Sequence, residues 1–220
     1  MEFKEKKKLK GDIKFNVSLN EEQKLAKGII INSKITVVKG SAGSGKSLMA
    51  AQVALDLLFT KQIEKIIITR PTVTAGEEIG FMPGNIDAKL APYTASVFDA
   101  LFRLYSKEKI ESCVQEGTIE VLPLAFMRGR NFTNCVVIVD EGQNITDKQM
   151  RLLLGRLCVG SKIVICGDQS QIDLRDAKQS GFNFICKNLV GIEGFSLVTL
   201  KTNHRDPIVE QIIDVYNKFD

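Results

Sequence analysis

The sequence predicts an α/β fold, with a mostly parallel sheet and helices on both of its faces. Runs rich in Val and Ile recur along the chain, as in "KITVVKG", "EKIIITR", "NCVVIVDE" and "SKIVICGD", and segments with helical patterns separate them. Continuous apolar strands are typical of sheets buried on both faces, and strands that alternate with helices favour parallel pairing. Glycine-rich or acidic turns follow three of these runs, where ligands bind in such sheets.

The expected elements follow one another without an internal repeat or a long linker. In order, we expect a strand at 34–40, a helix at 47–60, a strand at 64–70, a helix at 86–105, strands at 117–124 and 134–141, a helix at 147–157, a strand at 161–168, a helix at 176–189, a strand at 195–200 and a helix from Pro207. An earlier helix starts near Ser18, which has Glu21 at capping-box spacing. Gly160 is the predicted C-cap of the 147–157 helix.

Composition limits the classes of protein that fit. The chain has 220 residues, of which 44% are hydrophobic and 25% charged, as is ordinary for one globular α/β domain. Its net charge of +4 permits nucleic-acid binding without arguing strongly for it. Apolar runs are too short to span a membrane and the N-terminus resembles no signal peptide, so we expect a cytoplasmic protein. Residues 1–12, "MEFKEKKKLKGD", are predicted to be a flexible lysine-rich tail, with a phosphate-contacting arm as the alternative.

The cysteines indicate core positions rather than a metal site. Five cysteines are scattered along the chain with a single histidine, and no C-x-x-C pair occurs. A zinc site is therefore not expected. Cys135 and Cys166 lie in apolar runs and are predicted to be reduced core residues.

The segment "ITVVKGSAGSGKSLMAAQ" contains the phosphate-loop motif G-x-x-x-x-G-K-[ST] between a β-branched strand and a helix-forming run. Its glycines let backbone N–H groups surround phosphate oxygens, and the following helix N-terminus adds partial positive charge. Lys46 would reach the β- and γ-phosphates of ATP, and the Ser47 hydroxyl would bind Mg²⁺. The alternative is a glycine-rich turn with an exposed lysine. The predicted nucleotide contacts of this loop are Gly40, Ser41, Ala42, Gly43, Ser44, Gly45, Lys46 and Ser47.

Two adjacent acids follow the apolar strand "VVIV". Asp140 is predicted to hold Mg²⁺ together with Ser47, in the Walker B role. Glu141 is predicted to accept a proton from the attacking water. Two acids in a solvated turn are the alternative, but that interpretation leaves the fully apolar strand before them unexplained.

Three glutamines have positions that suit a nucleotide. Gln171, in "GDQSQID", is predicted to reach the γ-phosphate, and Gln143 comes two residues after Glu141. Gln23 lies on the helix before the P-loop strand, where an amide can pair with an adenine edge. Each has a simpler alternative, as a turn or surface glutamine.

The basic loop Arg128–Gly129–Arg130 directly precedes the strand that carries Asp140. This position favours a role that faces phosphate or nucleic acid, and an ordinary basic surface loop is the alternative. Since an arginine finger speeds phosphoryl transfer by about 10³–10⁵, we also expect one here. Arg128 or Arg130 would supply it to a neighbouring subunit, in a head-to-tail contact that can close into a ring.

The segments "GSAGSGKS", "TRPTVTAGEEIGFMPG", "PLAFMRGRNF", "VDEGQN" and "GDQSQIDL" together closely resemble the PhoH-like family of P-loop ATPases, which is related to the ATPase core of superfamily-one helicases. The resemblance runs from about Gln23 to Tyr216. It implies a RecA-like P-loop NTPase fold, with residues 13–220 as one ATPase domain. It also implies ATP and Mg²⁺ as cofactors, single-stranded RNA rather than DNA as partner, and homo-oligomers up to a hexameric ring.

The resemblance also implies roles for single residues. Gln23 matches the adenine-reading glutamine, and Gln143 and Gln171 match glutamines of the two acidic motifs. Arg70 matches a segment that faces nucleic acid, and Arg205 matches an arginine that reaches phosphate, which makes it a finger candidate within the chain.

Two positions depart from the family pattern, and one feature of some relatives is not expected here. Gly142 replaces an alanine, a change expected to be harmless, and Asp206 stands where histidine is usual. The fused PIN nuclease domain of some relatives is not expected in this chain, and neither is its activity.

Three classes of function remain open at this stage. The first is an ATPase coupled to nucleic acid. The second is a thymidine-kinase-like nucleoside kinase, which also pairs a P-loop with D-E-x-Q but usually carries zinc-binding cysteine pairs. The third is a nucleotide-dependent scaffold with little turnover, which would bind ATP without releasing phosphate.

Overall fold

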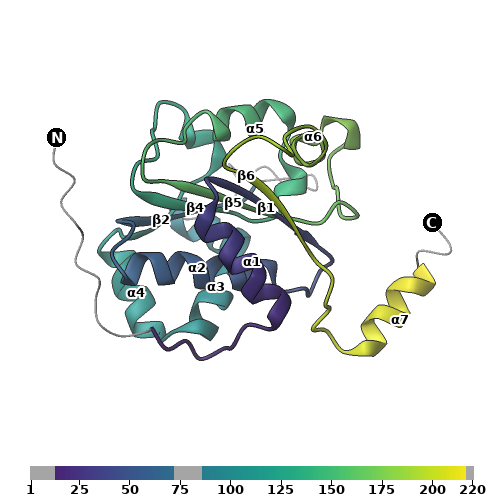
Figure 1. Ribbon diagram of the computed structural model, residues 1–220, viewed down its shortest axis with the longest axis horizontal. Coiled ribbons are helices and arrows are strands. Elements are labelled where there is room, and N and C mark those ends of the chain that lie inside the picture. Colours follow the sequence, from purple (N-terminus) through teal and green to yellow (C-terminus); the bar gives the residue numbers. More distant parts are fainter. Residues whose placement is uncertain (1–12, 72–85, 217–220) are drawn as a thin grey trace.

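The computed structural model describes residues 13–71 and 86–216, which build a six-stranded sheet (Figure 1). The strands are β1 (Ile35–Gly40), β2 (Lys65–Thr69), β3 (Ile119–Val121), β4 (Cys135–Val139), β5 (Lys162–Gly167) and β6 (Phe195–Leu200). Their order in the sheet is β3-β2-β4-β5-β1-β6, and every pairing between them is parallel. The predicted α/β fold is thus confirmed, with the P-loop strand and the acidic strand on either side of β5, as in RecA-like folds.

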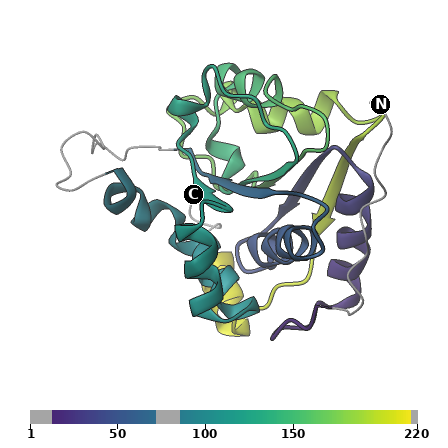
Figure 2. The ribbon, with the colours of Figure 1, turned by 90° about the vertical axis from the view of Figure 1, so that its left-hand side faces the viewer.

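Helices cover both faces of the sheet (Figures 1 and 2). One face carries α1 (Glu21–Asn32), α2 (Lys46–Phe59), α3 (Ile86–Leu104) and α4 (Lys107–Gln115), and the other carries α5 (Asp147–Leu154) and α6 (Gly181–Asn188). Three short 3-10 turns are η2 (Leu124–Met127), η3 (Gly142–Asn144) and η4 (Ala177–Gln179). The last helix, α7 (Pro207–Tyr216), extends away from the sheet in Figure 1.

The strands divide their apolar side chains between two cores, because successive residues of a strand point to opposite faces. In β2, Ile66 and Ile68 join the core with α1 to α4, whereas Ile67 joins the core with α5 and α6. Cys135 and Cys166 are buried and free, as predicted. Burial raises the pKa of the Cys166 thiol, which keeps this core side chain protonated.

Several element ends differ from the sequence-based expectation. Asn20, not Ser18, caps α1: its side chain accepts from Gln23 N at 2.8 Å, and the Gln23 side chain accepts from Asn20 N at 3.1 Å. Helix α5 ends at Leu154 with Gly155 as its C-cap, so Gly160 is not a cap. Gly160 instead occupies a turn with φ +75°, beside the Asn134 side chain.

Other differences concern which segments are helical. Helix α4 was not predicted, and α6 begins at Gly181 because Ala177–Gln179 forms the 3-10 turn η4. The 1–12 tail lies outside the described residues. None of the helices in the described part has both the length and the apolar content needed to cross a membrane.

Candidate nucleotide site

The P-loop connects β1 to α2 through two glycines in the left-handed region. Gly43 has φ +88° and Gly45 has φ +82°, conformations that favour glycine. A Cβ atom on Gly45 would lie 2.4 Å from Gln23 Nε2, so the close approach of α1 also requires glycine there. Lys46 is the first residue of α2, and its Nζ donates to Gly40 O at 2.7 Å and Ser41 O at 2.9 Å.

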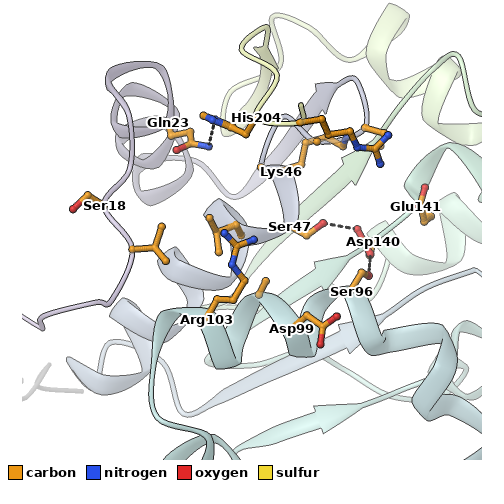
Figure 3. Close-up of a pocket in the computed structure, with 18 residues that line it drawn as sticks. Ser18, Gln23, Lys46, Ser47, Ser96, Asp99, Arg103, Asp140, Glu141 and His204 are labelled. Carbon is orange, nitrogen blue, oxygen red and sulfur yellow. Dashed lines mark hydrogen bonds between the residues drawn. The ribbon is translucent and has the colours of Figure 1, made fainter. Parts of the chain in front are cut away.

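Ser47 and Asp140 meet although 93 residues separate them in the chain (Figure 3). The Ser47 hydroxyl donates to Asp140 Oδ1 at 2.8 Å, and the Ser96 hydroxyl of α3 donates to Asp140 Oδ2 at 2.5 Å. Asp140 is only 4% exposed, and no ion pair to it occurs among the described residues. Within the described residues, the side-chain groups that donate hydrogen bonds to this carboxylate are these two hydroxyls.

A cavity of about 440 Å³ lies above this pair, within the size range of small-molecule sites. It is lined by Val17, Ser18, Gln23, Ala42, Gly43, Gly45, Lys46, Ser47, Leu48, Ser96, Asp99, Ala100, Arg103, Asp140, Glu141, Gly167, His204 and Arg205. Of the predicted loop contacts, Gly40, Ser41 and Ser44 do not line it. The Gly40 and Ser41 carbonyls accept from Lys46, and the Ser44 carbonyl accepts from Gln23 Nε2 at 3.3 Å.

Gln23 and the segment after β6 close one side of the cavity. Gln23 is buried, at 3% exposure, and its Nε2 lies 3.4 Å from His204 Nε2. His204 N donates to Gly43 O at 3.1 Å, which holds this segment on the P-loop. The side chain of Arg205 packs against Gly43 and lines the cavity. Asp206, which departs from the family pattern, accepts from Ile208 N at 3.0 Å and thus caps α7.

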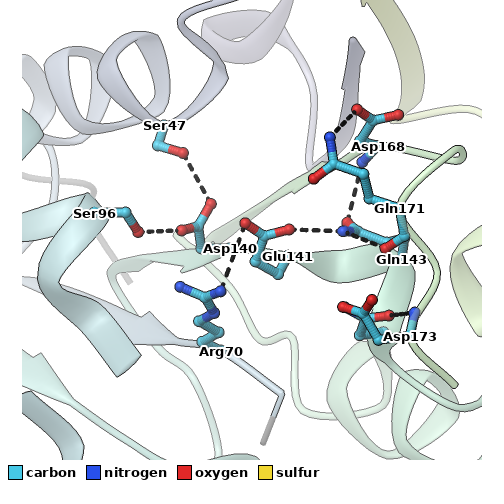
Figure 4. A network of polar contacts seen from close by, with 10 residues as sticks. Ser47, Arg70, Ser96, Asp140, Glu141, Gln143, Asp168, Gln171 and Asp173 are labelled. Atoms are coloured by element: carbon cyan, nitrogen blue, oxygen red, sulfur yellow. Dashed lines mark hydrogen bonds and ion pairs between the residues drawn. The ribbon is translucent and has the colours of Figure 1, made fainter. Parts of the chain in front are cut away.

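Glu141 lies at the other end of the cavity in an unusual backbone conformation, with φ +51°. Its carboxylate accepts from Gln143 Nε2 at 2.6 Å and lies 3.6 Å from Arg70 Nη2 (Figure 4). The Gln143 side chain is fully buried, donates to Gln171 O at 3.0 Å and accepts from Asp168 N at 3.0 Å. Gln143 therefore joins the ends of β4 and β5 and does not line the cavity.

Gln171 has a position outside the cavity as well. Its side chain is exposed and donates to Asp168 Oδ2 at 2.9 Å, so it is tied to its own turn. The prediction that Gln171 reaches a γ-phosphate would require this side chain to turn.

Arg130 lies away from the cavity of its own chain. The hypothesis that its loop reaches a neighbouring subunit stays a prediction. Arg130 donates to both oxygens of Glu120, at 2.6 and 3.1 Å, and Lys65 Nζ lies 3.0 Å from the same carboxylate. The hydrogen bond from Arg130 holds the pKa of Glu120 below its usual value. The physical reason is topological: residues before β4 lie at the amino end of the strand, whereas ligands bind at the carboxyl ends. Arg128 is exposed in the same loop.

Three lining residues of α3 were missed by the sequence analysis. Ser96, Asp99 and Arg103 have the i, i+3, i+7 spacing of one helix face, and they line the cavity together (Figure 3). That spacing was a usable signal, although it does not say which face meets the P-loop. His204, the single histidine of the chain, was also missed.

The residues present fit Mg²⁺ rather than a transition metal. A hydroxyl and a carboxylate are hard oxygen ligands, and Mg²⁺ is bound through one or two such groups plus substrate phosphates. No group of three or more His, Cys, Asp or Glu gathers within residues 13–71 and 86–216. Asp140, buried with only hydroxyl partners, is the carboxylate that a cation would neutralise.

The family model for PhoH-like proteins matches residues 17–217. This chain belongs to the PhoH-like protein family. It is 43% identical to a PhoH-like protein of Bacillus subtilis over 181 residues, which cover 81% of this chain and 57% of the relative. It is 40% identical over 186 residues to a PhoH-like protein of Synechocystis, with 84% of this chain and 57% of the relative covered. The chain thus spans about half the length of these curated relatives.

Among solved structures, two helicases have similar chains. The Pif1 helicase from Candida albicans matches with a TM-score of 0.48 and 17% identity, covering 91% of this chain and 43% of that chain. The UvsW helicase from bacteriophage T4 matches with a TM-score of 0.49 and 15% identity, covering 83% of this chain and 60% of that chain.

Proposed function

We propose that this PhoH-like chain is a cytoplasmic ATPase that binds ATP with Mg²⁺, hydrolyses it and couples hydrolysis to single-stranded nucleic acid. The observation that supports it most is the 2.8 Å hydrogen bond between the Ser47 hydroxyl and Asp140 at the mouth of the P-loop. Ser47 lies in the first turn of α2 and Asp140 follows β4, and they meet where a phosphate-bound Mg²⁺ needs its protein ligands. Bound Mg²⁺ would neutralise charge that develops on the phosphates during transfer.

Each residue of the site has a role in this proposal. When ATP binds, Lys46 Nζ gives up its hydrogen bonds to the Gly40 and Ser41 carbonyls and donates to the β- and γ-phosphates instead. Gln23 reads the adenine edge, because its buried amide lies beside the loop at one end of the cavity. Glu141 accepts a proton from the attacking water. Arg205, which lines the cavity beside Gly43, supplies positive charge within the same chain.

The nucleic-acid partner is supported by fewer contacts in the structure than the nucleotide site is. Arg70 follows β2 at the carboxyl edge of the sheet, next to Glu141, and Arg128 is exposed. The resemblance favours RNA over DNA, and it also favours a hexameric ring through which a strand would pass. Both remain part of the proposal, as do the roles of Gln143 and Gln171 at the nucleotide.

The test is phosphate release from ATP and Mg²⁺, with and without single-stranded RNA or DNA of equal length. We expect slow release alone and faster release with RNA, and no release from the Lys46→Ala control. Tight ATP binding with no release in any mixture would contradict the proposal and favour a nucleotide-dependent scaffold. Phosphate transfer to thymidine would favour a nucleoside kinase instead.

A further inference from the structure

The Glu141 carboxylate is held by two donors from two different strand ends (Figure 4). Its Oε1 lies 3.6 Å from Arg70 Nη2, and its Oε2 accepts the 2.6 Å hydrogen bond from Gln143 Nε2. Both carboxylate oxygens therefore have a donor from the protein itself. A general base must come within hydrogen-bond reach of the water that it activates. These two contacts set the position of the Glu141 side chain.

The position of the pair follows from the sheet. Thr69 and Val139 are partners in the β2–β4 register, and Asp140 N donates to Thr69 O at 2.9 Å. The residues that follow, Arg70 and Glu141, therefore leave neighbouring strand ends side by side. The left-handed backbone of Glu141 costs on the order of 1–3 kcal/mol, and such strain persists where the surrounding structure holds it.

The two contacts that restrain Glu141 differ in how easily another group can displace them. Gln143 is fully buried, and its amide also bonds to Gln171 O and Asp168 N. The side chains of Arg70 and Glu141 are 30% and 33% exposed. An ion pair with this exposure contributes only about 0.2–1 kcal/mol. Arg70 is therefore the restraint that another anion can remove, whereas Gln143 is fixed.

We propose that Arg70 is a positioning residue that restrains Glu141, and that a backbone phosphate of single-stranded nucleic acid competes with Glu141 for its guanidinium. This inference rests on the proposed function. A phosphate can accept two parallel hydrogen bonds from a guanidinium, which is stronger and better oriented than the single 3.6 Å contact to Glu141. Withdrawal of Arg70 leaves the carboxylate attached only through Gln143 and free to turn toward a water. Strand binding is thus linked to hydrolysis through one side chain.

The first test measures binding of a fluorescent single-stranded RNA to the protein at low salt, without nucleotide. If Glu141 competes for Arg70, Glu141→Gln tightens binding by up to about fivefold, as expected for a pair of about 1 kcal/mol. The gain must disappear in the Arg70→Gln background. An equal gain in both backgrounds reflects only the lost negative charge and overturns the inference. Unchanged affinity of Glu141→Gln in the wild-type background also overturns it.

The second test measures phosphate release. Arg70→Gln is expected to raise release without nucleic acid by about two- to fivefold and to remove stimulation by RNA. Arg70→Lys keeps a cation beside Glu141, so its release without RNA should be lower than that of Arg70→Gln. Arg151→Gln, which removes an exposed arginine paired with Asp147 on α5, keeps both properties. Release by Arg70→Gln at or below the wild-type rate overturns the restraint.

Failure of the proposed function and failure of this inference give different results. A wild-type protein that neither releases phosphate nor binds RNA contradicts the proposed function itself. A wild-type protein that does both, without coupling between Arg70 and Glu141, contradicts only this inference. Thermal unfolding shows whether Arg70→Gln folds; if it does not, Arg70→Ala takes its place in both tests.

Discussion

The ends of the central strands and the β3 edge both carry charged residues that the sequence analysis linked to phosphate, but they are arranged differently. At the centre, Ser47 and Asp140 converge and Glu141 lies next to them. At the edge, Arg130 is bound by Glu120 of β3. Parallel register brings the carboxyl ends of central strands to one place, whereas a residue before a strand lies at the opposite end. Whether a residue lies near the nucleotide site therefore depends more on which end of a strand it flanks than on its distance from a motif in the sequence.

The largest expected effect is a loss of ATP affinity, which should occur in a variant of the central site and not in a variant of the β3 edge. Lys46→Ala removes an ammonium group that makes two hydrogen bonds in the P-loop, and we expect ATP affinity to fall by about a thousandfold or more. Arg130→Ala, at the edge, should leave ATP affinity unchanged. Titration calorimetry measures both. Equal losses in the two variants would contradict the separation of centre and edge.

The next effect concerns the two candidate fingers. Arg205 lines the cavity, so Arg205→Ala should lower phosphate release by about a thousandfold, at the lower end of the range known for arginine fingers. Arg130→Ala should stay within about twofold of the wild type, because Arg130 is engaged by Glu120. Mixing Arg130→Ala with Lys46→Ala subunits provides the counter-test. Loss of hydrolysis in Arg130→Ala alone, together with recovery in that mixture, would show that Arg130 acts on a neighbouring subunit.

A third prediction concerns packing beneath the central site. A Cβ atom at Gly142 would lie 2.5 Å from Ile165 Cγ2 and 3.1 Å from Cys166 O, so alanine at this position would crowd β5. We expect Gly142→Ala to lower the free energy of unfolding by about 1–3 kcal/mol. Gly28→Ala is the matched control on α1, where nothing lies within 4 Å and alanine should stabilise the helix. Urea unfolding measures both, and equal stability of Gly142→Ala and wild type would contradict the packing argument.

The smallest expected effect is a pH-dependent change in the free energy of unfolding, caused by Glu120 at the β3 edge. The hydrogen bond from Arg130 lowers the pKa of Glu120 in the folded state from its ordinary value of 4.5. A lowered folded-state pKa stabilises the fold above the unfolded pKa, and this contribution is lost as pH falls through the folded value. Glu120→Gln should therefore lower the free energy of unfolding by about 0.2–1 kcal/mol at pH 7. The difference should vanish in acid, and a difference that is the same at pH 7 and below the folded pKa would contradict the ion-pair assignment.

The sequence predicted that the P-loop and Asp140 lie together at the carboxyl ends of strands because these signals are local. A glycine-rich loop between a strand and a helix, and acids directly after an apolar strand, fix both the type of residue and the strand end that carries it. The contributions of Ser96 and Arg103 depend on which face of α3 meets the P-loop, and this follows from packing against α2. Gln143 was assigned to the nucleotide because its motif gives a spacing, but the spacing does not give the direction of the side chain, which points toward β5.

The central claim is that Ser47, Asp140 and Glu141 form one site that hydrolyses ATP, with Glu141 as the base. Single-turnover phosphate release by Glu141→Gln tests it most directly, because this change preserves the size of the side chain and removes its ability to take a proton. We predict ATP and Mg²⁺ affinities close to those of the wild type, and phosphate release slower by about 10²–10⁴-fold. Release at the wild-type rate with normal affinity would contradict the account.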